Sequence, residues 1–114
     1  MTFIVLDRDG VINKDSDDYI KAADEWIPIE GSLEAIATLT ASGYRVAIAT
    51  NQSGLARGLF DEYALANIHQ KLCASVEDEG GFIEGIFFCP HGPDESCSCR
   101  KPGTGLLTRI EQEF

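Results

Sequence analysis

The sequence predicts an α/β fold in which helices cover both faces of a parallel sheet, a doubly wound, Rossmann-like architecture. Apolar runs of strand length alternate with segments of helical periodicity. This alternation is typical of parallel strands joined by right-handed crossovers. The first run, within residues 2–8, is continuously apolar, which indicates a buried parallel strand. A chain of 114 residues forms one domain at most.

The expected strands and helices follow one another in turn. We expect strands at residues 2–8, 44–50 and 83–88, and helices at residues 32–42, 61–79 and 104–113. Ser32 and Asp61 are the expected N-caps of the first two helices, because their side-chain oxygens can accept from a free backbone N–H group. Gly43 and the glycines at 80–81 are expected to end those two helices.

Polar side chains follow each predicted strand. Asp7 and Asp9 come after the first strand, Thr50-Asn51 end the second, and a cysteine-rich loop with Arg100-Lys101 follows the third. The carboxyl ends of parallel strands meet at one edge of a sheet, where such folds place their ligands. The sequence therefore predicts one site at this edge rather than scattered polar loops.

The paired carboxylates Asp7 and Asp9 carry the most informative chemistry. Gly10 follows them and lets the backbone turn sharply. Two crowded acids suit one carboxylate as nucleophile, the other as proton shuttle, and a hard cation nearby. The alternative is a strand-end turn with hydrogen bonds from the aspartates to their own backbone. The position directly after an apolar strand favours the functional interpretation.

Residues 50–54 form a second polar cluster. A hydroxyl and amides at a strand end, followed by free backbone N–H groups, can hold phosphate oxygens. Taken alone, this cluster indicates only a polar turn. Arg100 and Lys101 could neutralise a phosphate, although a basic dipeptide alone is usually a solvated surface pair.

Three of the four cysteines lie close together in the chain. With one histidine they offer the ligand types of a closed structural zinc site: Cys89, His91, Cys97 and Cys99. The alternatives are free thiols on a loop, or a redox pair, for which the C-x-C spacing is unusual. Cys73 is expected to be a small buried side chain within a helix.

The net charge of −10 argues against a nucleic-acid or anionic-membrane partner, because such partners need a basic face. The sequence shows no stretch of transmembrane length and no secretory signal, so we expect a cytoplasmic protein with reduced thiols. His69 is expected at the surface or paired with a neighbour. Trp26 is expected to anchor the irregular loop of residues 13–31.

The motifs Asp7-x-Asp9-Gly10, Thr50-Asn51 and Lys101-Pro102 resemble, in this order, the first three motifs of the haloacid dehalogenase-like (HAD) phosphatases. Residues 6–13, residues 49–54 and the Cys-x-His…Cys-x-Cys-Arg-Lys-Pro loop are similar to the D-glycero-D-manno-heptose 1,7-bisphosphate phosphatases and their histidinol-phosphatase relatives. The resemblance implies a HAD-type hydrolase of lipopolysaccharide heptose biosynthesis. It would release the 7-phosphate of a small phosphorylated sugar through an aspartyl-phosphate, with histidinol phosphate as the alternative substrate.

The resemblance also implies a role for each matching residue. Asp7 would be the nucleophile, and Asp9 would protonate the leaving sugar oxygen and then deprotonate water. Mg²⁺ would bind the Asp7 carboxylate and the Asp9 backbone carbonyl. A structural Zn²⁺ in the loop at residues 89–99 would shape the substrate loop. Phosphate and substrate would be held by polar and cationic side chains: Thr50, Asn51, Gln52, Arg100 and Lys101.

The fourth motif of the HAD phosphatases, acidic residues that complete the magnesium site, has no counterpart after Lys101 in these 114 residues. We therefore expect a single HAD-like domain, residues 1–114, that lacks the C-terminal strands and has weak or no activity as this chain. Its first strand would form an apolar sheet edge through which copies could associate. A zinc-stapled binding fragment without turnover is the second class of function, and only the enzyme would need Asp7.

Overall fold

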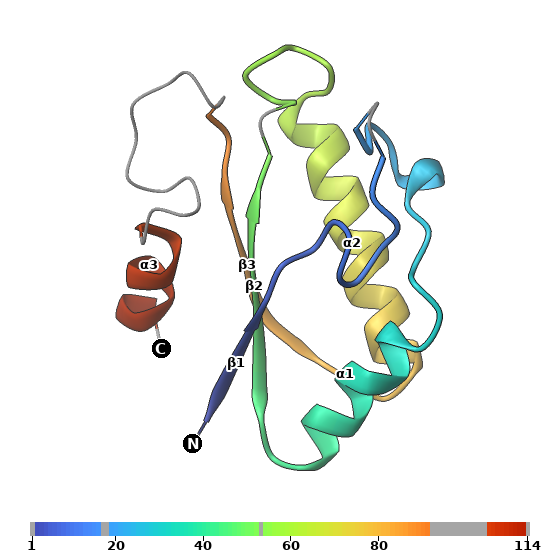
Figure 1. Cartoon of the computed structure of the whole chain (residues 1–114), viewed down its shortest axis with the longest axis vertical. Helices are drawn as coiled ribbons and strands as arrows, with labels where there is room; N and C mark the ends of the chain where they lie inside the picture. The colour runs from blue at the N-terminus through green and yellow to red at the C-terminus, as the bar shows by residue number, and fades with distance from the viewer. Residues whose placement is uncertain (1, 17–18, 53, 92–104, 114) are drawn as a thin grey trace.

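The computed structural model describes residues 2–16, 19–52, 54–91 and 105–113, apart from the side chains of residues 107 and 108. Its strands and helices follow the predicted order (Figure 1). The elements are β1 (Phe3–Leu6), η1 (Ala23–Glu25), α1 (Ser32–Ala41), β2 (Arg45–Asn51), α2 (Glu62–Asp78), β3 (Ile83–Cys89) and α3 (Gly105–Glu113). No helix of the described residues combines the length and hydropathy needed to cross a bilayer.

The three described strands form one parallel sheet in the order β1-β2-β3. Leu6, the last residue of β1, is opposite Ile48 of β2. Asn51, the last residue of β2, is opposite Cys89, the last residue of β3. All three strands therefore end at the same edge of the sheet, and the polar segments that follow them begin there.

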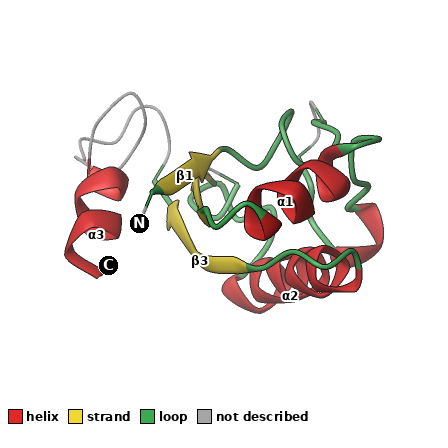
Figure 2. Cartoon of the chain, turned by 90° about the horizontal axis from the view of Figure 1, so that it is seen from below, coloured by secondary structure: helices red, strands yellow, loops and turns green. Residues whose placement is uncertain are grey.

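Strand β2 is buried on both faces, and its alternate residues belong to different cores. Val46 and Ile48 lie in a cluster with residues of α1 and α2. Ala47 and Ala49 lie in a second cluster with Leu106 and other residues on the α3 side. Figure 2 shows α3 on one side of the sheet and α1 and α2 on the other. The doubly wound architecture predicted from the sequence is confirmed.

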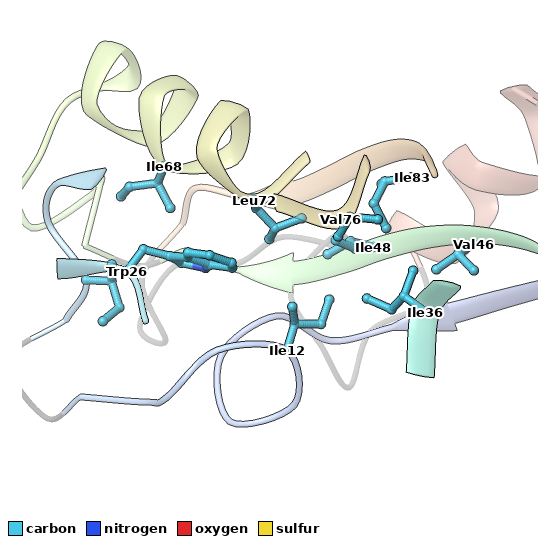
Figure 3. Packing of buried hydrophobic residues seen from close by; sticks show 10 residues of the cluster. Ile12, Trp26, Ile36, Val46, Ile48, Ile68, Leu72, Val76 and Ile83 are labelled. Atoms are coloured by element: carbon cyan, nitrogen blue, oxygen red, sulfur yellow. The ribbon is translucent and has the colours of Figure 1, made fainter. Parts of the chain in front are cut away.

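The larger core lies between the sheet and the pair α1 and α2 (Figure 3). Leu72 and Val76 of α2 are fully buried there, beside Ile36 of α1. Trp26 is 1% exposed in the same cluster. Since Trp26 comes from the irregular segment before α1, its burial confirms that it anchors this loop to the core.

Strand β1 differs from the buried strand that its continuous apolar run predicts. Its residues are half-buried, and Val5 is 38% exposed. The physical reason is that, among the described strands, β1 has a neighbour on one side only. This position agrees with the expected apolar edge.

The predicted end signals of α2 are confirmed. The Asp61 side chain accepts a hydrogen bond of 2.8 Å from the backbone N–H of Ala64, which makes Asp61 the N-cap. Gly80, with a positive φ of 92°, follows the helix. Gly43 has a φ of 91° just after α1, as expected of a glycine that ends a helix.

The predicted N-cap of α1 is wrong. Gly31, with a φ of 87°, occupies the cap position and Ser32 is the first helical residue. The Ser32 hydroxyl instead donates a hydrogen bond of 2.8 Å to the carbonyl of Ile12. Ser32 thus ties α1 to the segment after β1, a contact that local sequence does not reveal.

Candidate active site

A cavity of about 240 Å³ lies where β1 and β2 end. Its walls include ten residues from three segments: Asp7, Arg8, Asp9, Asp15, Ser16, Tyr19, Ile20, Thr50, Asn51 and Gln52. Five of the predicted site residues are therefore brought together from two strand ends. The wall is rich in carboxylate, hydroxyl and amide groups, which are suited to a polar ligand.

The segment after β1 folds into a tight turn that presents both carboxylates. The carbonyl of Arg8 accepts hydrogen bonds from the backbone N–H groups of residues 11, 12 and 13, at 3.2, 2.8 and 3.2 Å. Gly10 has a φ of 80°, a conformation that L side chains rarely adopt. The glycine predicted to permit a sharp turn therefore has that role.

The Asp9 carboxylate is held by four side-chain hydrogen bonds. Its Oδ1 accepts from Arg8 Nε at 3.2 Å, from Arg8 Nη2 at 2.7 Å and from Asn13 Nδ2 at 3.0 Å. Its Oδ2 accepts from Gln52 Nε2 at 3.1 Å. These donors orient Asp9 before any ligand binds.

Arg8 is 1% exposed although it carries a positive charge. Besides its contacts to Asp9, its Nη1 lies 3.1 Å from Nε2 of His69 on α2. Burial, and next the positive charge of Arg8, lower the pKa of His69 from 6.5 to about 4, while Asp9 opposes the shift. His69 is therefore neutral at pH 7, and Nε2 accepts the hydrogen bond because a guanidinium can only donate.

Gln52 links the two strand ends. Its Nε2 donates to Asp9 Oδ2 at 3.1 Å and to Thr50 Oγ1 at 2.9 Å. Gln52 and Thr50 are 3% and 1% exposed. Both N–H groups of the Gln52 amide thus donate to side chains of the protein. Asn51, which is half-buried, is also part of the cavity wall.

Asp7 is the exposed member of the carboxylate pair. Its Oδ1 accepts a hydrogen bond of 2.7 Å from the backbone N–H of Arg8, which helps to fix the side chain at the strand end. An oriented, exposed carboxylate in a cavity wall is accessible to an incoming ligand. Asp9 is better shielded, with 23% of its side chain exposed.

Two of the four predicted zinc ligands fall within the described residues. Cys89 is buried at the end of β3, and its Sγ lies 3.5 Å from Nδ1 of half-buried His91. Cys97, Cys99, Arg100 and Lys101 lie outside the described residues. Within the part of the chain that the structure describes, no group of three or more His, Cys, Asp or Glu side chains could hold a metal ion.

A larger cavity, of about 760 Å³, lies between residues 55–62 and the Pro90-His91 segment. It shares no lining residue with the carboxylate cavity, and acidic Asp61 and Glu62 belong to its wall. We place the candidate active site in the smaller cavity, because of these two cavities among the described residues it is the one where carboxylates meet a hydroxyl and amides at the sheet edge.

Sequence reasoning assigned no role to Arg8 and Asn13, and expected His69 at the surface or paired with a neighbour. The structure shows that His69 is paired, and that its partner is a side chain of the site. A cation between two acids is a signal that could have identified Arg8. No sequence signal joins Arg8 to His69, because the contact spans 61 positions of the chain.

The fold and the site together define a HAD-like α/β protein. The model of the family described as polynucleotide kinase 3 phosphatase matches residues 2–114, and the chain belongs to this family. This confirms at the level of fold and family the resemblance that the motifs indicated.

Two curated relatives carry the same name, D-glycero-beta-D-manno-heptose-1,7-bisphosphate 7-phosphatase. The protein of Pseudomonas aeruginosa is 54% identical over 113 residues, which are 99% of this chain and 64% of the relative. The protein of Bordetella bronchiseptica is 53% identical over 114 residues, 100% of this chain and 64% of the relative. The chain therefore spans just under two thirds of the length of these relatives.

Solved structures agree with these relatives. The D,D-heptose 1,7-bisphosphate phosphatase of B. bronchiseptica, complexed with magnesium and phosphate, matches with a TM-score of 0.96 and 53% identity over 99% of this chain and 63% of that one. A protein of Mesorhizobium loti described as HAD-like matches with a TM-score of 0.86 and 34% identity over 98% of this chain and 56% of that one. The predicted fold class is thereby confirmed.

Proposed function

We propose that this chain carries the phosphoryl-transfer site of a magnesium-dependent phosphatase whose substrate is D-glycero-β-D-manno-heptose 1,7-bisphosphate, from which it releases the 7-phosphate. The names of the relatives support the substrate and the reaction. The magnesium and phosphate bound by the B. bronchiseptica protein support the ligands.

One observation carries the proposal. An exposed aspartate, Asp7, shares a cavity wall with Asp9, Thr50 and Asn51, and the Asp9 carboxylate is oriented by four hydrogen bonds. A simple polar turn does not require such orientation. Two carboxylates with different surroundings suit two different roles, one as nucleophile and one in proton transfer.

The chemistry follows from these positions. An Asp7 oxygen attacks phosphorus, an O–P bond forms to Asp7, and the bond from phosphorus to the sugar oxygen breaks while Asp9 donates a proton to that oxygen. Asp9, now ionised, then takes a proton from water as the water attacks the aspartyl-phosphate. Phosphate leaves, and the Asp7 carboxylate is restored. Thr50, Asn51 and Lys101 are proposed to hold the phosphoryl oxygens.

The donor set fits magnesium, which prefers hard oxygen ligands. The Asp7 carboxylate is exposed in the cavity, whereas the Asp9 carboxylate is occupied by Arg8, Asn13 and Gln52. On the resemblance to the HAD phosphatases, we propose the Asp7 carboxylate and the Asp9 backbone carbonyl as the protein ligands. A bound magnesium ion would neutralise charge on the phosphoryl oxygens.

Because weak or no turnover is expected of residues 1–114 without the fourth motif, the proposal is tested first by binding of beryllium fluoride, which mimics the aspartyl-phosphate. Phosphate release from the heptose bisphosphate is measured in a chain that adds that motif. We expect magnesium-dependent beryllium fluoride binding that Asp7→Asn abolishes. Asp24→Asn, an equal change of charge at an exposed position on η1, is the matched control and retains binding. Phosphate affinity that depends on neither Asp7 nor magnesium would instead support a binding fragment without turnover.

Substrate choice is tested in parallel assays. Histidinol phosphate is the alternative substrate, and the names of the relatives favour the heptose bisphosphate over it. A 3′-phosphorylated oligonucleotide is included because of the family's description. With a net charge of −10 we propose no nucleic-acid or anionic-membrane partner, since like charges repel. Preference for the oligonucleotide would overturn that part of the proposal.

We also propose a structural zinc ion held by Cys89, His91, Cys97 and Cys99. The 3.5 Å separation of Cys89 Sγ and His91 Nδ1 supports it. Bond lengths of about 2.3 Å to sulfur and about 2.0 Å to nitrogen in a tetrahedron place the two ligand atoms about 3.5 Å apart. Zinc thiolates require reduced cysteines, which agrees with a cytoplasmic location.

Metal analysis tests the zinc site. We expect one zinc per chain, lost in Cys89→Ser but retained in Cys73→Ala, since Cys73 packs against the α1–α2 core instead. A chelator should lower the melting temperature of the wild-type protein and leave that of Cys89→Ser unchanged. Equal zinc content in all three proteins would contradict the assignment.

Self-association through β1 also remains a proposal. It is supported by the edge position of β1 among the described strands and by the 38% exposure of Val5. Light scattering over a range of concentrations tests it. A monodisperse monomer at high concentration would count against pairing through this edge.

A further inference from the structure

The guanidinium group of Arg8 is buried and contacts two side chains, that of the adjacent residue Asp9 and that of His69, 61 positions away in the chain. Its Nε and Nη2 donate to Asp9 Oδ1 at 3.2 and 2.7 Å, and its Nη1 lies 3.1 Å from His69 Nε2. At 1% exposure, it is almost entirely removed from water. A buried arginine requires partners for its donors, and Asp9 and His69 supply them.

His69 is placed to fix the outer end of that guanidinium. His69 lies on α2, and the preceding residue, Ile68, is fully buried in the core. The centroid of the His69 ring is 6.3 Å from that of the Phe88 ring on β3. A rigid helix therefore presents the acceptor. Since Arg8 only donates, His69 Nε2 carries no proton and the neutral ring holds its proton on Nδ1.

As a result, the two Asp9 carboxylate oxygens accept different numbers of hydrogen bonds. Oδ1 accepts three hydrogen bonds, two from Arg8 and one from Asn13 at 3.0 Å. Oδ2 accepts one among the described residues, from Gln52 at 3.1 Å. A carboxylate oxygen has two lone pairs, so Oδ1 is saturated and Oδ2 retains one lone pair for a proton.

We propose that Arg8 and His69 are a positioning pair that anchors Oδ1 of Asp9 and so directs proton transfer through Oδ2. This inference rests on the proposed phosphatase function. The proton on Oδ2 passes to the sugar oxygen as its bond to phosphorus breaks, and a proton from the attacking water later returns to Oδ2. Neither Arg8 nor His69 touches the substrate in this scheme, and His69 acts on Asp9 only through Arg8.

The experiment compares two leaving groups in a chain that adds the acidic fourth motif to residues 1–114, because weak or no activity is expected of these residues alone. An alkyl phosphate such as the sugar phosphate needs a proton on its leaving oxygen, whereas p-nitrophenyl phosphate leaves without one. In His69→Leu, kcat/KM for the alkyl phosphate should fall at least about 10-fold further than kcat/KM for the aryl phosphate. General acid catalysis usually contributes about 100-fold or more to the rate, and a misdirected Asp9 would lose part of that contribution. His69→Gln, whose amide oxygen can accept from Arg8, should recover most of the loss.

Phe88→Leu is the control, because it removes the ring that packs on His69 and leaves the hydrogen bond to Arg8. It should change both substrates by the same factor. Equal losses of kcat/KM for both substrates in His69→Leu would overturn the proposal that Arg8 and His69 position Asp9, because a purely structural role of His69 predicts equal losses. Should His69→Leu not fold, Arg8→Lys, which keeps the charge but not the fork, is expected to show the same leaving-group dependence.

A measurement without turnover accompanies these assays. At pH 7, the ¹⁵N spectrum of wild-type His69 should show the neutral ring with Nδ1 protonated, and a proton on Nε2 would overturn the pair. Failure of the proposed function has a different signature. It would leave wild-type protein and Asp7→Asn equally unable to bind beryllium fluoride, while the His69 spectrum stayed as expected.

Discussion

The stability of the protein should depend on the protonation of His69 in mildly acid solution. In the folded chain the pKa of His69 is lowered from 6.5 to about 4, first by burial and then by the charge of Arg8. Between these two values the unfolded chain binds a proton that the folded chain does not. Stability is therefore unaffected by His69 above pH 6.5 and falls as the pH drops from 6.5 through 4.

The magnitude follows from the shift. At about 1.4 kcal/mol per pH unit, the difference between 6.5 and about 4 makes a full loss of about 3.5 kcal/mol from this one side chain, of which about 3 kcal/mol is reached at pH 4. His69→Gln removes the titrating group and can keep an acceptor for Arg8. The free energy of unfolding of wild-type protein, relative to His69→Gln, should thus fall by about 3 kcal/mol between pH 7.5 and 4.

Urea unfolding followed by circular dichroism, at intervals of half a pH unit, measures this difference. Comparison with His69→Gln cancels the carboxylates that titrate in both proteins. An NMR titration of the His69 ring gives its pKa directly and separates the cause from the effect. Parallel stability curves for the two proteins, or a His69 pKa near 6.5, would refute the reasoning.

Three further substitutions test the fold by urea unfolding. Leu72→Ala should cost about 2–5 kcal/mol, since Leu72 is fully buried in the core between the sheet and its helices, and a loss below 1 kcal/mol would show that the core closes over the cavity. Gly54→Ala should cost about 1–3 kcal/mol, because a Cβ there runs into the buried ring of Phe60, and an unchanged midpoint would contradict this contact. Asp61→Ala should cost about 1 kcal/mol through the lost hydrogen bond from Ala64, while Asp61→Asn, which keeps an acceptor, should cost little; equal losses would exclude the cap as the cause.

Local features of the sequence were sufficient to predict the three strands and the three α-helices, whereas the short helix η1 lies in a segment that was expected to be an irregular loop. The apolar run of β2 and the periodicity of α2 have physical causes within a few residues, and so do the Asp61 cap and the glycines that end the helices. The same holds for the prediction that Asp7 and Asp9 meet Thr50. Parallel strands end at one edge, so the order of the elements already places these residues together.

Features that depend on distant neighbours were not predictable in this way. The Ser32 hydroxyl could cap α1, but the carbonyl of Ile12, 20 positions away, takes its hydrogen bond. The composition of β1 indicates burial on both faces, whereas its exposure depends on which strands lie beside it. Both outcomes depend on contacts for which the local sequence contains no signal.

The amino-acid sequence by itself determined the class of fold, because periodicity and chain order are local properties. It also determined the sheet edge at which the candidate site lies and the two carboxylates at that edge. Only the tertiary structure decided how Asp9 is oriented. That orientation depends on α2 bringing His69 to within 3.1 Å of Arg8 and on β2 bringing Gln52 to within 3.1 Å of Asp9. Hydrogen bonds of this kind require ångström-scale placement of distant segments, which the packing of the core supplies.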